Sequence, residues 1–275
     1  MKGTPLSDAN DVALTVRAIA LGMKLALNLP KVFTLRELEH YEANLDELPG
    51  ILRNGSRFTA TATQEGATQT EPPPRPSFAF ADTNALKAIE EAEDFAEKHF
   101  GHRPDLRKQF TMPKVLPWKI VIAVYDPGTL THRQAVEQAL KAQPKLKSVY
   151  EERDLMDYKD AKASGKPTLR FVERSTQPTP DTMNLTADEM VATGRVFLDL
   201  RGYIIAFGMY HKVTGHFLDP KTWTRFPTSR LPDGGVASGY WFPGYSKVRF
   251  DWDYAGYRGS DIGGREAVNC ALATP

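Results

Sequence analysis

The chain contains, at residues 231–268, the segment LPDGGVASGYWFPGYSKVRFDWDYAGYRGSDIGGREAV, which is dense in Tyr, Trp, Asp, Ser, Gly and Arg and poor in Leu and Met. Its middle alternates, because Val248, Phe250 and Trp252 fall on one side of an extended chain. The residues that fall on the other side are all charged: Lys247, Arg249, Asp251 and Asp253. This period of two predicts a half-buried strand, with one face anchored in a core and the other in solvent. Tyr254 and Tyr257 follow among glycines, which predicts a displayed loop after the strand.

This mixture of residues is typical of binding surfaces. Tyr and Trp provide large contact areas for few rotatable bonds, while Ser, Gly and Asp provide adaptable polar contacts. Aromatic and Arg side chains also dominate the energetics of protein interfaces. On composition alone, an ordinary β-hairpin with aromatic residues in the core explains the segment equally well, because scattered exposed apolar residues are normal on any surface.

Several short motifs near the C-terminus carry a family resemblance. They are TWTRFPTSR at 222–230, Asp233-Gly234, GYW at 239–241, VRFDW at 248–252 and IGGREAV at 262–268. Together they resemble the end of a C-type-lectin-like domain. More narrowly, they resemble the variable proteins diversified by retroelements (the targets of diversity-generating retroelements), which share a fold with the formylglycine-generating enzymes. A weaker similarity extends back to Pro117.

The resemblance implies binding rather than catalysis. In that family a C-terminal segment is rewritten at chosen codons, and the varied side chains form a solvent-facing ligand site on a fixed scaffold. Carried over to this chain, the implied ligand-binding residues are Tyr240, Trp241, Tyr245, Lys247, Arg249, Asp251, Asp253, Tyr254, Tyr257, Ser260 and Asp261. The implied scaffold residues are Val248, Phe250, Trp252 and Ile262. The chain departs from the family pattern at Gly264, where the family has an aromatic residue before the closing Arg265, and in the residues that follow Val268.

The fold class that these observations predict is α+β: an N-terminal helical module followed by a C-terminal C-type-lectin-like domain with short twisted antiparallel strands. Residues 1–56 are predicted to form a helical hairpin, with helices from Val12 to Leu27 and from Thr34 to about Leu48. Residues 57–81 are a Pro-rich linker, and residues 82–275 form the α+β domain. The hairpin is too small to form a core alone, so it docks on the rest of the chain or on a second copy. A homo-oligomer formed through these helices is therefore one option.

Within residues 82–275 the pattern predicts helices mixed with strands. Residues 82–84 cap a helix from Ala85 to His99, which Gly101 terminates. The other expected elements are a strand at 118–125, a helix at 132–142, a strand at 167–172 and a helix that begins with a capping box from Thr186 to Glu189. Residues 143–166 are charged and predict a mixture of helix and loops. Two interpretations of residues 196–213 stay open, a helix with one apolar face or a strand pair that turns at 201–202.

Composition argues against several classes of protein. Lys and Arg number 35 against 34 Asp and Glu, so the net charge of +1 gives no general drive toward nucleic acid or anionic membranes. The single Cys270 excludes an intrachain disulfide and a zinc site built on several cysteines. We expect no cofactor and no metal. No apolar run reaches the roughly 20 residues of a membrane span, and the N-terminus lacks the pattern of a signal peptide. We therefore expect no membrane insertion and a cytoplasmic or virion-associated protein.

The sequence offers little to support an enzyme, because it has no nucleophile elbow, no His-Glu-x-x-His motif and no phosphate loop. Histidine pairs at 99/102 and 211/216 lie near predicted helix ends, where capping or packing explains them better than metal binding. Asp251 and Asp253 are the best carboxylate pair, roughly 6–7 Å apart along one strand, and nothing nearby predicts a raised pKa.

The function that we expect from the sequence is non-enzymatic binding of an unknown protein or glycan ligand, with a phage or prophage as one source of the gene. One alternative is a virion-type structural assembly protein that uses the same aromatic patch as a subunit interface. The other is a carboxylate-dependent hydrolase built on Asp251 and Asp253.

Overall fold

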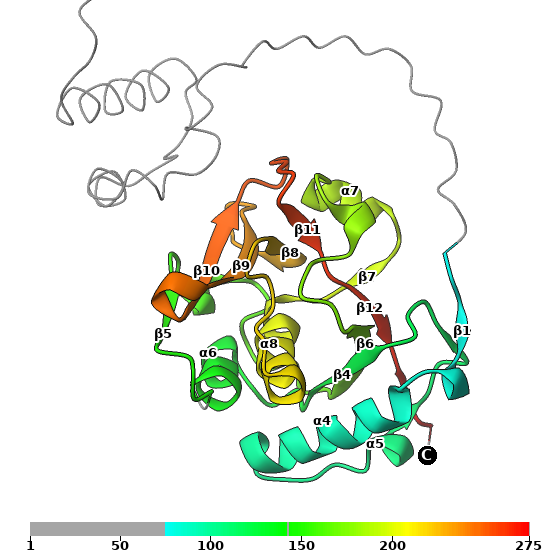
Figure 1. The fold of residues 1–275 in the computed structure, drawn as a ribbon. Helices are drawn as coiled ribbons and strands as arrows, with labels where there is room; N and C mark the ends of the chain where they lie inside the picture. The colour runs from blue at the N-terminus through cyan, green and yellow to red at the C-terminus, as the bar shows by residue number, and fades with distance from the viewer. Residues whose placement is uncertain (1–74, 142, 275) are drawn as a thin grey trace, which may run out of the picture. The chain divides into compact units, whose positions relative to one another are not determined.

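A five-stranded and a four-stranded β-sheet, two long helices and several short elements form the part of the chain that the structure describes, residues 75–141 and 143–274 (Figure 1). The structure is a computed structural model. The helical hairpin predicted at 1–56, and the linker as far as residue 74, lie outside the described residues. The described part is mixed α+β, and its sheets are small, as predicted.

The four-stranded sheet contains the most deeply buried strand. Its order is β4 (Val121–Asp126), β6 (Thr168–Glu173), β12 (Glu266–Asn269) and β7 (Val196–Phe197), and all neighbours are antiparallel. Every residue of β4 is buried, because helices α4 (Ala85–Phe100) and α8 (Leu200–Thr214) both pack against it. β12 comes from near the end of the chain and pairs with β6 and β7, so this sheet joins the last part of the described region to its middle (Figure 1).

The five-stranded sheet carries the segment quoted above. Its order is β11 (Ile262–Gly264), β8 (Trp223–Arg230), β9 (Val236–Phe242), β10 (Lys247–Asp253) and β5 (Ser148–Glu151). The three central strands form a meander, and they are antiparallel, as predicted for the strands of this domain. The two edge strands differ from the prediction, because β11 runs parallel to β8 and β5 runs parallel to β10. Both edge strands arrive through long connections rather than hairpins, and such connections permit parallel pairing.

The helix boundaries follow from local sequence. α4 ends at Gly101, whose φ of +80° favours glycine. The side chain of Asn84, which precedes α4, does not cap it. Instead its amide nitrogen donates to the Val121 carbonyl at 3.0 Å and its oxygen accepts from the Val121 amide at 2.7 Å. The start of α4 is therefore fastened to β4.

Helix α8 settles the two interpretations of residues 196–213. It begins after Asp199, which accepts a hydrogen bond from the Gly202 amide at 2.6 Å, and the predicted strand turn at 201–202 is wrong. Gly208 is needed because a Cβ there would lie 2.5 Å from the carbonyl oxygen of Ala139. That close contact packs α8 against the π-helix η3 (Val136–Leu140), which continues helix α6 (His132–Ala135).

Short elements complete the structure. Helix α7 (Ala187–Ala192) has the predicted capping box between Thr186 and Glu189. The remaining short helices are η2 (Phe80–Asp82), α5 (Leu106–Gln109), η4 (Leu155–Asp157), η5 (Pro180–Thr182) and η6 (Pro243–Tyr245). The remaining strands pair two by two, β1 (Phe78–Ala79) with β3 (Val115–Leu116) and β2 (Phe110–Thr111) with β13 (Ala271–Leu272). No helix among the described residues has the length and apolar character needed to span a membrane.

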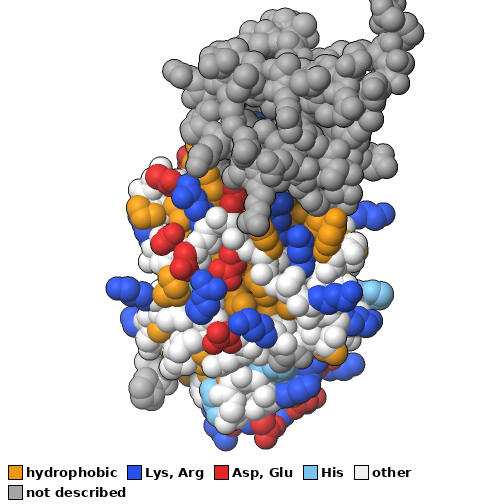
Figure 2. Space-filling view, turned by 90° about the vertical axis from the view of Figure 1, so that its left-hand side faces the viewer, with side chains coloured by type: hydrophobic (Ala, Val, Ile, Leu, Met, Phe, Trp, Pro, Cys, Tyr) orange, Lys and Arg blue, Asp and Glu red, His pale blue; other side chains and the backbone are white. Residues whose placement is uncertain are grey.

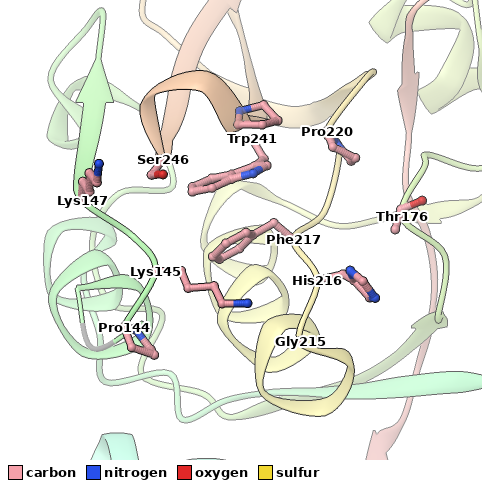
Figure 3. A pocket seen from close by; sticks show the side chains of 11 residues that line it. Pro144, Lys145, Lys147, Thr176, Gly215, His216, Phe217, Pro220, Trp241 and Ser246 are labelled. Atoms are coloured by element: carbon pink, nitrogen blue, oxygen red, sulfur yellow. The ribbon is translucent and has the colours of Figure 1, made fainter.

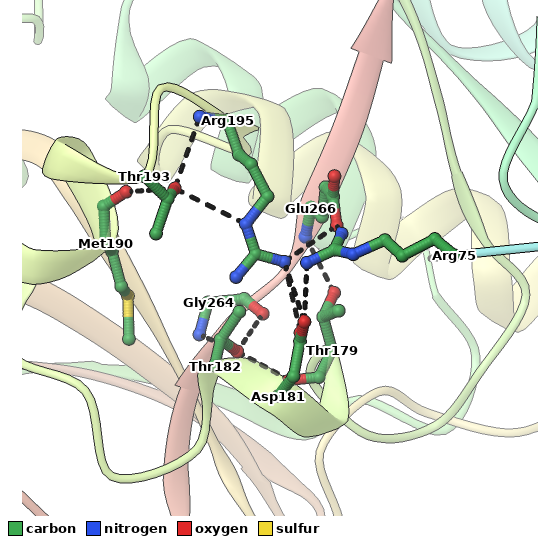
Figure 4. A network of polar contacts seen from close by, with 9 residues as sticks. All are labelled: Arg75, Thr179, Asp181, Thr182, Met190, Thr193, Arg195, Gly264 and Glu266. Atoms are coloured by element: carbon green, nitrogen blue, oxygen red, sulfur yellow. Dashed lines mark hydrogen bonds and ion pairs between the residues drawn. The ribbon is translucent and has the colours of Figure 1, made fainter. Parts of the chain in front are cut away.

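A polar network holds the start of the described region against β12. Arg195 donates to Asp181 at 3.1 Å and to Glu266 at 3.1 Å, and Arg75 contacts the same two carboxylates (Figure 4). Beneath them, the hydroxyl of Thr182 accepts from the amide of Gly264 at 2.9 Å. The network therefore connects residue 75 with the closing strands of the domain.

Candidate ligand-binding surface

The outer face of the five-stranded sheet carries the alternating charges of β10. Val248 and Phe250 are buried, whereas Lys247 and Arg249 are partly exposed, so the predicted alternation is confirmed at these positions. Trp252 lies on the inner side but stays half-buried. Ile262, the other predicted scaffold residue, is buried in β11.

Strand register brings aromatic side chains beside these charges. Arg249 pairs with Tyr240 of β9 and with Tyr150 of β5, and residues paired in this way point to the same face of a sheet. The ring of Trp223 from β8 lies 3.7 Å from that of Tyr240, measured between centroids. We call the outer-face group the aromatic–cation surface; it consists of Tyr150, Trp223, Tyr240, Phe242, Tyr245, Lys247 and Arg249.

The two cations of this surface lie over its rings. The Nζ of Lys247 is 4.8 Å from the ring centroid of Tyr245, 5.2 Å from Phe242 and 5.4 Å from Tyr150. The guanidinium of Arg249 is 5.0 Å from the ring of Tyr150 and 5.9 Å from that of Trp223. Contacts of this kind contribute about 0.5–1 kcal/mol each at exposed sites, so together they order the rings and the cations.

Carboxylates complete the row of charges. Arg249 contacts Asp251 at 2.7 Å and Glu152 at 3.4 Å. Figure 2 shows the side of the molecule on which β5 lies in Figure 1; hydrophobic, basic and acidic side chains are interspersed there rather than separated into single-sign regions. The surface therefore suits a ligand that offers both polar and apolar groups.

Asp253 has an unusual environment. Its carboxylate lies 3.8 Å from Nη2 of Arg225, a buried side chain of β8. Burial raises the pKa of Asp253 to about 6, although Arg225 acts in the opposite direction. The expectation that nothing nearby raises a carboxylate pKa is therefore wrong for Asp253. Its cause is burial in the folded domain, which strand periodicity cannot reveal.

The loop between β10 and β11 carries the other candidates. Tyr254 is exposed and meets the edge of Trp252 at 5.5 Å, while Tyr257 lies 5.6 Å from the Arg225 guanidinium. Arg225 also donates to the Tyr257 carbonyl at 2.7 Å, which fixes the loop on the sheet. Ser260 and Asp261 are exposed, and the Asp261 carbonyl accepts from the Trp223 amide at 2.8 Å. The loop and the aromatic–cation surface are thus continuous through Trp223.

Trp241 is placed differently from the other candidates. It is buried, pairs with the inward-facing Val248, and lies with its ring 3.9 Å from that of Phe217. Its neighbour Tyr240 faces the opposite side of β9. A ligand on the outer face cannot contact Trp241, so its inclusion with the displayed residues needs correction.

Several residues of the surface were missed in the sequence. Phe242 shares the period-two pattern of Tyr240, so the alternation along β9 could have revealed it. Trp223 stands within the quoted motif at 222–230, but nothing local indicates which way it points. Tyr150 and Glu152 lie in a charged segment whose strand, β5, is defined by its long-range pairing with β10.

The closing motif around Arg265 is structural. The guanidinium of Arg265 is buried and contacts Asp219 at 2.9 Å, and Asp219 also accepts from the hydroxyls of Tyr203 and Thr224. Gly264 lies against Phe197, because a Cβ at that position would be 2.7 Å from the Phe197 ring. The ring that lies beside residue 264 therefore comes from Phe197 of β7.

One histidine of each predicted pair, His99 and His211, takes a packing role in the structure. His211 is buried, bonds the side chain of Gln143 at 2.9 Å and stacks on Phe217, while His99 packs against Phe95. Burial lowers the pKa of both His99 and His211. Among the described residues, no group of three or more His, Cys, Asp or Glu side chains is arranged to hold a metal ion.

Comparisons of the chain with protein-family models, with curated proteins and with solved structures gave no match.

Proposed function

We propose that this chain is a ligand-binding protein and that its recognition site is the aromatic–cation surface together with the loop at 254–261. The observation that carries the proposal is the alignment of Tyr150, Tyr240 and Arg249 across three neighbouring strands. Aromatic side chains held on a sheet lose little conformational entropy on binding, because their rotamers are already restricted. A rigid platform of rings and Arg side chains is the usual composition of interface hot spots.

The ligand class that this composition favours is a protein or a glycan. Lys247 and Arg249 are accompanied by Asp251 and Glu152, so the surface has no excess of one sign that would select a polyanion. The resemblance to retroelement-diversified variable proteins supports the same function. In that case the codons of the displayed residues are adenine-rich in the template repeat, and a reverse transcriptase gene lies beside this one in a phage or prophage.

A binding screen on glycan and protein arrays tests the proposal. The parent is compared with a variant that carries Tyr240→Ala, Tyr245→Ala and Arg249→Ala. A control carries Leu86→Ala and Lys87→Ala, two exposed positions on α4. Melting curves establish that each protein is folded. We expect the parent and the control to bind a common partner and the triple variant to lose it.

Two results would count against a recognition site. If the folded triple variant binds as the parent does, the aromatic rings are scaffold. If the parent forms a large assembly at low concentration and the triple variant does not, the surface is a subunit interface, and the virion-type structural function replaces ligand binding. Sedimentation velocity of the same proteins distinguishes these outcomes.

One observation favours a second function. Asp253, with its pKa raised to about 6, lies on the same strand face as Asp251, which is ion-paired with Arg249. Two carboxylates in different environments can divide the roles of acid and base in hydrolysis. The test is turnover of a panel of aryl glycosides. The hydrolase hypothesis requires activity in the parent that Asp251→Asn and Asp253→Asn each abolish; an inactive parent refutes it for those substrates.

A further inference from the structure

A cavity of about 580 Å³ lies on the side of β9 that is opposite the aromatic–cation surface. It is lined by residues from three segments, 144–147, 215–220 and 241–246, together with Thr176 (Figure 3). The hydrogen bond from the Lys147 amide to the Ser246 carbonyl, 2.8 Å long, fastens the first segment to the third. Its volume is in the range of small-molecule sites, which is about 300–1,000 Å³.

The floor of the cavity is a row of stacked rings. The ring of Phe217 lies 3.9 Å from that of Trp241 with an interplanar angle of 29°, and His211 stacks on the other face of the row at 4.3 Å and 13° from Phe217. The Trp241 amide donates to the carbonyl of Asp219 at 3.2 Å, which holds the strand and the loop together. Phe217 and Trp241 are both largely buried, and Trp241 and His211 cover the two faces of Phe217, so the row of rings is preorganised.

The walls of the cavity are basic. Lys145 and Lys147 stand on one side and His216 on the other, and the side chain of Lys145 runs below the ring of Phe217 (Figure 3). None of the described residues that line the cavity is acidic. The charge of Lys145 also contributes, after burial, to the lowered pKa of His211. This environment differs from the aromatic–cation surface, where Arg249 contacts two carboxylates.

We infer that this cavity binds a planar aromatic anion. Its ring would contact Trp241 and the edge of the Phe217 ring, and its carboxylate or phosphate would be neutralised by Lys145 and Lys147. A neutral ring would gain these ring contacts without the charge pairing, and a cation would be repelled by both lysines. The inference is independent of the proposed function, because the cavity and the recognition surface lie on opposite sides of β9 and contain different side chains.

Binding of small probes to the full chain tests this inference. The probes are 2-naphthoate, 2-naphthyl phosphate and the neutral 2-naphthamide, and titration calorimetry measures their dissociation constants. We expect at least one anion to bind roughly tenfold or more tightly than the amide, because charge-assisted contacts add to the ring contacts. The preferred anion identifies whether the site takes a carboxylate or a phosphate. If neither anion binds at millimolar concentration, or if the amide binds as well as both, the inference is wrong.

Variants locate the site. A double variant with Lys145→Gln and Lys147→Gln should bind the anion roughly tenfold or more weakly than the parent does. Its weak binding of the amide should be unchanged. The matched control is Lys141→Gln, an exposed lysine that pairs with Glu137 and does not line the cavity. Trp241→Phe keeps an aromatic floor and should change the intrinsic fluorescence response to the anion while preserving binding. Unchanged affinity in the double lysine variant would overturn the inference, and so would equal losses in the variant and the Lys141→Gln control.

Discussion

Arg265 and Asp219 form a buried ion pair at the centre of the domain, with side-chain exposures of 2% and 0%. Asp219 is further satisfied by the hydroxyls of Tyr203 and Thr224, at 2.8 and 2.6 Å. Burial raises the pKa of Asp219, while Arg265 and the hydroxyl donors act against that shift. The pair joins the closing motif to α8 and β8, so the motif stabilises the fold rather than contacting a ligand.

Replacing Arg265 with Ala should be strongly destabilising. The substitution leaves the Asp219 carboxylate buried without its cation, and such losses cost about 3–5 kcal/mol. Urea denaturation of the parent and the variant measures the change in the free energy of unfolding. Arg107→Ala, at an exposed position of α5, serves as the control and should change stability by less than about 0.5 kcal/mol. Similar stabilities of the two variants would contradict the structural role of Arg265.

Asp253 should make stability depend on pH. Its pKa rises from 3.8 to about 6 on folding, so the folded protein holds this proton more tightly than the unfolded chain. Its contribution is complete below pH 3.8 and is lost as the pH rises through 6, by roughly 2–3 kcal/mol in total. Asp253→Asn removes this titration. The stability of Asp253→Asn relative to the parent should therefore increase between pH 4 and pH 7, and parallel pH profiles would show that Asp253 is not perturbed.

At the residue scale, the sequence predicted the direction of a side chain only where the periodicity of its own strand determines that direction. The alternation of Val248 and Phe250 with Lys247 and Arg249 follows from strand periodicity alone. Trp241 was assigned to the wrong face, because its direction depends on the register that pairs it with Val248. The raised pKa of Asp253 was equally inaccessible, since it depends on burial in the folded domain, which the local pattern does not show.

At the scale of elements, helix α8 is fitted to its neighbour by Gly208. A Cβ at this position would lie 2.5 Å from the Ala139 carbonyl oxygen and 3.1 Å from the ring of Phe95. Gly208→Ala should therefore lower the melting temperature, even though alanine is the better helix former by about 1 kcal/mol. The expected net loss is about 1–3 kcal/mol, as for other overpacked cores. Lys87→Ala, on the exposed face of α4, is the control, and a Gly208→Ala protein more stable than the parent would contradict the packing.

Elements with local signals were predicted well. The capping box at Thr186 and Glu189 and the terminating Gly101 both lie where expected, because caps are set by residues a few positions apart. β5 was not predicted, since it lies in a charged segment and its pairing with β10 is long-range. The choice between helix and strand pair at 196–213 was also open. Most of α8 is buried, which weakens the amphipathic pattern that separates the two.

At the scale of the whole molecule, the two larger sheets have different surroundings. The four-stranded sheet packs against α4 and α8 through its fully buried strand β4 and includes β12 from the end of the domain. The five-stranded sheet presents an ordered outer face of rings and paired charges. The predicted N-terminal hairpin and its part in oligomerisation lie outside the described residues and stay predictions.

The central claim is that this outer face recognises a ligand, and the dissociation constant of the first array partner tests it most directly. That constant is measured for the parent, for Tyr240→Ala and for the control that carries Leu86→Ala and Lys87→Ala. Equal melting temperatures establish that the three proteins are equally folded. Truncation of a central aromatic hot spot costs about 2 kcal/mol or more, so Tyr240→Ala should weaken binding by roughly thirtyfold while the control leaves it unchanged. Equal dissociation constants for all three proteins would contradict the claim.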